Sequence, residues 1–181
     1  MEVKITYFVH GTTTDNETGK STGWNPGELS DIGIKQSHEL KETIKNKEFD
    51  AVFSSDLKRA VDSARIIFGE NFTQDKRLRE CNYGDLNGSD ESKVDLKSHI
   101  DIRFPNGECS KDVEKRIRSF LSDILTKYDG KHIAIVGHRS PHLALEVVLN
   151  KKTWEQAIKE DWHQTKAWQP GWIYEVSEEK L

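Results

Sequence analysis

The stretch ITYFVHG, residues 5–11, is a short apolar run that ends in a histidine and a glycine. Residues 3–9 and 132–136 are nearly continuous runs of apolar or β-branched side chains, and residues 51–53 form a shorter run of the same kind. Such runs are typical of strands that are covered on both faces of a parallel sheet. We therefore predict three buried strands, the first of which ends directly before His10.

Helical patterns lie between the predicted strands. In residues 56–68 and 110–125 the apolar side chains recur at helical spacing, with Asp56 as the expected N-cap of the first helix. Ser30 is expected to cap a further helix that runs to about Lys45. This alternation predicts an α/β fold, a three-layer sandwich with a central, mostly parallel sheet and helices on both faces.

Polar residues follow the ends of the predicted strands. His10 follows the first strand, Ser54 and Ser55 follow the second, and His138 follows the last. In open α/β sheets, ligands collect beyond the carboxyl ends of the strands. We therefore expect these side chains to meet in one site. This expectation follows from the order of strands and polar residues alone.

Two long segments lack a regular pattern. Residues 11–29 have few apolar side chains and many Thr, Gly and Asn, which predicts a long loop that starts at the candidate site. Residues 85–107 are also irregular, with room for one helix, and are expected to cover the pocket.

Composition narrows the class of protein. The chain has 181 residues, no internal repeat and no linker, so residues 1–181 are expected to form a single domain. With a net charge of −4 and no Lys/Arg stripe interleaved with aromatic residues, a nucleic-acid partner is not expected. No apolar run approaches the ~20 residues that cross a bilayer, so no membrane partner is expected and the location is expected to be cytoplasmic. Cys81 and Cys109 are then expected to be free thiols.

Several motifs together resemble those of a known family. They are HGTTTDN at residues 10–16, SSDLKRA at 54–60, RLRE at 77–80, GE at 107–108 and IVGH at 135–138. Their order and setting resemble the histidine phosphatase superfamily, in particular its phosphoglycerate-mutase-like branch. The resemblance covers most of the chain and implies the phosphoglycerate-mutase-like form of the α/β sandwich.

The resemblance assigns roles to the first motif. His10 would be the nucleophile, because a neutral imidazole attacks well near neutral pH. Gly11 would let a phosphate approach the backbone closely. Thr13 would order the loop, and Asn16 would donate a hydrogen bond to the phosphate.

The remaining catalytic residues come from the other motifs. Arg59 would bind phosphate, Glu80 would protonate the leaving oxygen, and His138 would contact the transferred phosphoryl oxygens. Without the family, Arg59 is a surface arginine, Glu80 an ordinary ion-pair partner, and His138 a strand-end histidine bonded to the backbone. Asp85 and Glu17 are weaker candidates for the acid.

One position departs from the family pattern. The family usually has arginine immediately before the first histidine, and this chain has Val9. Arg139 stands where the family commonly has glycine, so it is the candidate to replace the missing cation. Lys20 and Lys58 are alternatives, and His142 could add a donor. The outcomes left open are compensation, a slow enzyme, or a protein that binds phosphate without turnover.

The expected function is hydrolysis of a phosphomonoester, a small phosphorylated metabolite, through a phosphohistidine, without a metal or cofactor. The alternatives are a phosphoglycerate mutase and an inactive phosphate-binding relative. Mutases of the family are usually longer, which favours the phosphatase. The protein is expected to be a monomer or homodimer.

Two further patterns have simpler explanations. The spacing of His138 and His142 is that of two helical metal ligands, but Pro141 starts a helix between them, so no metal site is predicted. The tryptophans near the C-terminus are expected to be mostly core, with one or two in the pocket wall, and Trp172 begins a final strand; they are Trp154, Trp162, Trp168 and Trp172.

Overall fold

The computed structural model describes residues 1–167 and 169–181, and its centre is a five-stranded sheet in the order β4-β3-β6-β1-β7. The strands are β1 (Glu2–Val9), β3 (Ala51–Ser54), β4 (Thr73–Gln74), β6 (His132–Gly137) and β7 (Trp172–Ser177). β4, β3, β6 and β1 are parallel, and β7 pairs antiparallel with β1. The predicted strands and the mostly parallel sheet are therefore confirmed.

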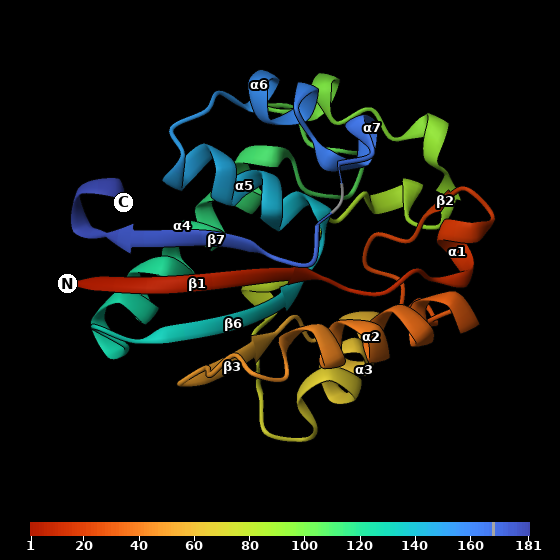
Figure 1. Cartoon of the computed structure of the whole chain (residues 1–181). Helices are drawn as coiled ribbons and strands as arrows, with labels where there is room; N and C mark the ends of the chain where they lie inside the picture. Colours follow the sequence, from red (N-terminus) through yellow and green to blue (C-terminus); the bar gives the residue numbers. More distant parts are fainter. Residues whose placement is uncertain (168) are drawn as a thin grey trace.

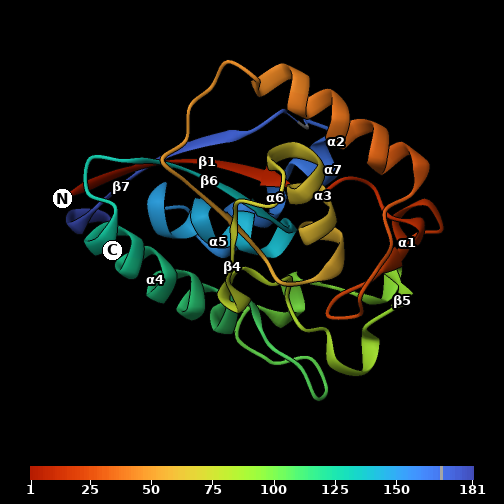
Figure 2. The same cartoon turned by 90° about the horizontal axis from the view of Figure 1, so that it is seen from below.

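Helices cover both faces of the sheet (Figures 1 and 2). The helices on one face are α2 (Asp31–Ile44) and α3 (Lys58–Phe68), and those on the other are α4 (Ser110–Lys127) and α5 (Arg139–Leu149). Two short helices, α6 (Trp154–Lys159) and α7 (Trp162–Thr165), lie beyond α5. This is the predicted three-layer α/β sandwich.

The core explains why the strands are apolar on both sides. Tyr7 and Ile135 belong to the apolar cluster that includes α4 and α5, and both are fully buried. Phe8 and Val136, one residue along each strand, belong to the cluster with α2 and α3. Successive side chains of a strand point to opposite faces, so a sheet with two covered faces needs apolar residues at every position.

The two irregular segments pair with each other at the carboxyl edge of the sheet. The first contains a short helix, α1 (Thr14–Glu17), and a short strand, β2 (Lys20–Ser21). β2 pairs antiparallel with β5 (Ser89–Asp90) of the second segment. The rest of the second segment holds no α-helix; its regular turns are three 3-10 helices, η2 (Gly84–Leu86), η3 (Glu91–Lys93) and η4 (Lys97–His99). Two further 3-10 helices are η1 (Lys76–Leu78) and η5 (Glu178–Lys180).

Asp56 does not cap α3, so that prediction is wrong. The helix begins at Lys58 behind Leu57, which makes no side-chain cap. Asp56 instead accepts two hydrogen bonds from Arg79, each 2.7 Å long. A bidentate pair with a guanidinium is stronger than a single bond from a backbone amide, so the arginine takes the carboxylate. The cap at Ser30 is confirmed.

Two smaller expectations can be compared with the structure. Cys81 and Cys109 are free and buried, as predicted, and burial raises the pKa of the Cys81 thiol. In the described parts of the chain, no helix is both long and apolar enough to cross a bilayer.

Candidate active site

The strand ends converge as the sequence predicted. The His10 amide donates to Gly137 O over 3.1 Å, and the Ser55 amide donates to Val136 O over 3.0 Å, so the ladders of the sheet continue into the site. The rings of His10 and His138 lie with their centroids 5.1 Å apart. The carboxyl ends of β1, β3 and β6 therefore deliver three polar side chains to one place.

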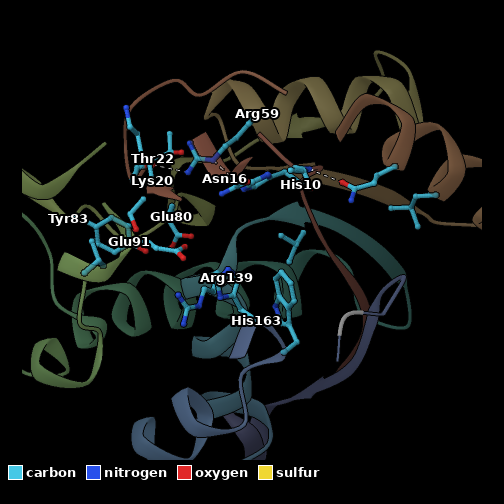
Figure 3. A pocket seen from close by; sticks show the side chains of 18 of the residues that line it. His10, Asn16, Lys20, Thr22, Arg59, Glu80, Tyr83, Glu91, Arg139 and His163 are labelled. Atoms are coloured by element: carbon cyan, nitrogen blue, oxygen red, sulfur yellow. Dashed lines mark hydrogen bonds between the residues drawn. The ribbon is translucent and has the colours of Figure 1, made fainter. Parts of the chain in front are cut away.

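A cleft of about 720 Å³ opens over this edge (Figure 3). Five of the predicted site residues line it: His10, Asn16, Arg59, Glu80 and Arg139. His138 is fully buried and is not among the lining residues, nor are Gly11 and Thr13. The other candidate acids, Asp85 and Glu17, also lie outside the lining.

The hydrogen bonds of His10 fix its tautomer. Nδ1 lies 2.7 Å from Gly11 O, and Nε2 lies 3.2 Å from Nε of Arg59. A carbonyl only accepts and a guanidinium only donates, so Nδ1 carries the proton and Nε2 offers its lone pair. Burial, and then the charge of Arg59, lower the pKa of His10 to about 3. His10 is therefore a neutral imidazole whose Nε2 lone pair accepts a hydrogen bond from Arg59.

Arg59 is a buried cation held rigidly beside that nitrogen. It lies in the first turn of α3, with 2% of its surface exposed. Nη1 donates to Asn25 O over 3.0 Å, and Nη2 donates to Gly23 O over 2.8 Å. With the bond to His10, these contacts use three of the five N–H groups of the guanidinium. The remaining donors and the charge are available to an anion bound in front of His10.

His138 has one satisfied ring nitrogen and one unsatisfied. Nε2 lies 2.8 Å from Ser55 Oγ, and the backbone of His138 is tied to the hydroxyl of Tyr7 by bonds of 2.7 and 2.8 Å. Nδ1 is buried and has no partner among the residues that the structure describes. Burial, followed by the charges of Arg59 and His10, holds the pKa of His138 well below its usual range. A neutral ring with one open nitrogen can bond an oxygen of a bound anion.

Two backbone amides bind one oxygen of the Glu80 carboxyl group. Oε1 accepts from the amides of Cys81 and Ser140 over 2.8 and 3.0 Å. Its own carbonyl accepts from Trp24 Nε1 over 2.8 Å and from Arg116 Nη2 over 2.9 Å. Within residues 1–167 and 169–181, Oε2 has no hydrogen-bond partner, and the carboxyl group lines the cleft.

The loop after His10 is ordered by local hydrogen bonds. Thr13 Oγ1 accepts from the Asn16 amide, and Asn16 Oδ1 accepts from the Thr13 amide, each over 3.0 Å. This reciprocal capping box starts α1 and leaves the amide nitrogen of the Asn16 side chain at the cleft. A Cβ on Gly11 would lie 2.4 Å from Gly33 O, so the close packing of the loop on α2 also requires glycine there.

Val9 and Arg139 both line the cleft, as the sequence hypothesis of compensation requires. The Nε of Arg139 forms an ion pair with Oδ2 of Asp161, whose side chain is fully buried. Arg139 is thus neither directed to solvent nor paired with Glu146, which binds Lys152 over 2.6 Å. Whether Arg139 replaces the missing arginine stays a prediction.

The alternative cations differ in their position. Lys20 lines the cleft. Lys58 does not, and it pairs on the surface with Glu28 and Asp62. His142 is buried, with its ring 4.4 Å from that of Trp172, and is absent from the lining.

Sequence reasoning missed several residues of the site. Asp161, the N-cap of α7, carries no motif, and it pairs with Arg139 at the start of α5 across 22 residues of chain. Tyr83 and Glu80 both line the cleft, and Tyr83 was not among the predicted site residues. Ser55 was placed at the edge, but its bond to His138 was not expected.

The tryptophans divide as expected. Trp154 belongs to the core, Trp162 lines the cleft, and Trp172 packs against Trp162 with ring centroids 5.9 Å apart. Trp168 lies outside the described residues.

The model of the histidine phosphatase superfamily, branch 1, matches residues 7–167. The chain belongs to this superfamily. A 2,3-bisphosphoglycerate-dependent phosphoglycerate mutase of Allorhizobium ampelinum is 30% identical over 169 residues, which is 82% of this chain and 80% of that protein. The curated relatives of this chain therefore include a protein named as a mutase.

Solved structures share the fold. The mycobacterial glucosyl-3-phosphoglycerate phosphatase has a TM-score of 0.76 at 24% identity, over 87% of this chain and 84% of that one. A phosphoserine phosphatase variant from Entamoeba histolytica gives the same TM-score of 0.76 at 24% identity, with coverage of 87% and 84%. At this identity the likeness shows the fold of the chain and nothing finer.

The buried histidines predict that acid destabilises the protein. The pKa of His10 falls to about 3 and that of His142 to about 4, in both cases first through burial, and that of His138 is also lowered. Below the unfolded-state pKa of ~6.5 the unfolded chain binds protons that the folded chain does not, so stability falls as the pH drops. Each fully shifted histidine contributes up to ~1.4 kcal/mol per pH unit between 6.5 and its folded pKa. Urea unfolding at pH 7 and pH 5 measures this loss.

A matched variant checks the origin of this pH dependence. His142→Gln removes one buried imidazole outside the cleft, so the slope of stability against pH should become shallower. Equal stability of the wild type at pH 7 and pH 5 would show that these histidines are not held neutral by the fold.

Proposed function

We propose that this histidine phosphatase hydrolyses a phosphomonoester, a small phosphorylated metabolite, through a phosphohistidine on His10. The observation that carries the proposal is the neutral His10, whose Nε2 lone pair lies 3.2 Å from the Arg59 guanidinium at the floor of the cleft. A fixed cation beside a part-buried neutral nucleophile attracts a phosphate, and the phosphorus then lies in reach of that nitrogen.

In the first step Nε2 of His10 attacks phosphorus in line. The N–P bond forms as the bond from phosphorus to the ester oxygen breaks, and protonated Glu80 gives its proton to that oxygen. Arg59, the open Nδ1 of His138 and the side-chain amide of Asn16 hold the other phosphoryl oxygens. If Ser55 donates its hydroxyl proton to Nε2 of His138, the ring proton resides on Nδ1, where a phosphoryl oxygen accepts it.

In the second step water replaces the histidine. Glu80, now a carboxylate, takes a proton from the water as its oxygen attacks phosphorus and the N–P bond breaks. Inorganic phosphate leaves, and His10 returns to the neutral tautomer that its bonds to Gly11 and Arg59 favour. This water reaches His10 through the cleft, whose lining includes Lys20 and Ser21 of β2.

Every charge in this scheme comes from a side chain, so we expect phosphate release to survive EDTA. A screen over sugar phosphates, phosphoglycerates, nucleotides and phospho-amino acids, with and without EDTA, measures it. The blank is His10→Ala in the same panel. Turnover that chelation abolishes and zinc restores would contradict the scheme.

A mutase is the second candidate, because the Allorhizobium ampelinum relative bears that activity in its name. Mutases must shield the phosphoenzyme from water while the intermediate turns over. Here the segment between Glu80 and Glu108 forms short 3-10 turns and the strand β5, which pairs with β2, rather than a helical cover. Efficient conversion of 3- to 2-phosphoglycerate after priming with bisphosphoglycerate would favour the mutase.

Val9, in the place of an arginine, is expected to lower the turnover rate. Loss of one preorganised donor costs ~10²–10³ in rate, so turnover below that of relatives with arginine is expected unless another cation compensates. A wild-type protein that binds inorganic phosphate but releases none from any ester would be a binding protein instead.

A further inference from the structure

Two cations that line the cleft, Lys20 and Arg139, have no part in the proposed chemistry, and Arg139 is paired with a buried carboxylate. Arg139 is the first residue of α5, and a quarter of its side chain is exposed, at the cleft. Its Nε pairs with Asp161, which is fixed in turn by accepting the His163 amide at Oδ1 over 3.1 Å. The guanidinium is therefore held in one orientation by a buried partner.

The free edge of this guanidinium suits a flat anion. Neither Nη1 nor Nη2 has a hydrogen-bond partner among the described residues. With Nε taken by Asp161, the two terminal nitrogens are the donors left for a ligand. A fork of N–H groups binds the two oxygens of a carboxylate in parallel, which a lysine at the same place could not do.

Arg139 lies with the proton donor rather than with the nucleophile. The next residue, Ser140, donates its amide to Glu80 over 3.0 Å. Figure 3 shows Arg139 on the wall opposite Arg59, with Glu80 at the level between them.

Arg139 lies where the leaving part of the substrate is expected to bind. The proton of Glu80 goes to the leaving oxygen, so groups beside Glu80 and on the far wall from Arg59 face the portion of the molecule beyond that oxygen. A cleft of about 720 Å³ has room for a small metabolite there as well as its phosphate.

We propose that Arg139, positioned by Asp161, binds a carboxylate on the leaving part of the substrate, so that the enzyme prefers phosphorylated hydroxy acids. The assignment rests on the proposed hydrolysis, and it differs from a role of Arg139 at the transferred phosphoryl group. If Arg139 bound the transferred phosphoryl group, the hydrolysis of every phosphomonoester would depend on Arg139 to the same extent.

The test compares two substrates that differ in one group. 3-Phosphoglycerate has a carboxylate where glycerol 3-phosphate has a hydroxymethyl group, and p-nitrophenyl phosphate carries neither. Arg139→Gln should lower the ratio of kcat/KM for 3-phosphoglycerate over glycerol 3-phosphate by ~10–100-fold, the value of a hydrogen bond to a charged group. Arg139→Lys should restore only part of the ratio, and Asp161→Asn should lower it through loss of the anchor.

The matched control is Arg103→Gln, which breaks another Arg–Asp pair, on the surface with Asp112 and outside the cleft. It should leave the ratio as in the wild type. An equal loss on all three substrates in Arg139→Gln would overturn the carboxylate assignment in favour of the phosphoryl role. An unchanged ratio with unchanged rates would also overturn it.

A binding measurement separates this inference from the proposed function. Titration calorimetry of His10→Ala with the same two ligands needs no turnover. Tighter binding of 3-phosphoglycerate that Arg139→Gln removes supports the inference even if the wild type hydrolyses nothing. Equal binding of the two ligands, with p-nitrophenyl phosphate still hydrolysed by the wild type, overturns the inference and leaves the hydrolysis standing.

Discussion

His10→Asn is expected to lower kcat by ~10⁴-fold or more and to abolish the phosphoenzyme. The Asn amide can still donate to Gly11 O in place of Nδ1, so the loop keeps its anchor. It cannot supply the lone pair that Nε2 presents beside Arg59. Phosphate release, together with intact-protein mass spectrometry after a quench that avoids acid, measures both effects.

A second histidine gives the control for this variant. His132→Asn changes a part-buried histidine at the start of β6, the opposite end of the strand that leads to His138, where Nε2 contacts Thr6 Oγ1 over 2.8 Å. It should remain active. A His10→Asn protein that still gained a phosphoryl group during turnover would show that another side chain is the nucleophile.

Glu80→Gln is expected to lower kcat/KM by ~10²–10⁴-fold for alkyl phosphates and by much less for p-nitrophenyl phosphate. Glutamine keeps an oxygen for the amides of Cys81 and Ser140, so the side chain stays in place. It has no acidic proton to give. An alkoxide leaves poorly without that proton, whereas nitrophenolate leaves without help. Initial rates over a series of esters with graded leaving groups measure the difference.

Asp85→Asn is the control, since Asp85 was a weaker candidate for the acid. Its carboxylate bonds to the Asn106 side chain over 3.1 Å and does not line the cleft, so activity should be kept. Equal losses for alkyl and nitrophenyl esters in Glu80→Gln would mean that Glu80 positions the site and does not transfer a proton.

The amino-acid sequence alone determined the elements and the place where they meet. Apolar runs identified the buried strands, and the histidines directly after them had to reach the same edge, because parallel strands end together. Short-range contacts follow the spacing as well: Ser30 caps α2 as predicted, and Thr13 and Asn16, for which no pairing was predicted, cap each other across three residues. These interactions depend on spacing along the chain, which the sequence displays.

The tertiary structure decided which of several partners each charged group takes. Asp56 was a reasonable helix cap until Arg79, 23 residues away, came within 2.7 Å and took both oxygens. His138 meets Ser55 across 83 residues, and Arg139 meets Asp161 across 22. No local pattern selects these pairs. Each is set by how helices and loops pack on the sheet, and burial then makes the selected pair strong, because a charge away from water must be matched.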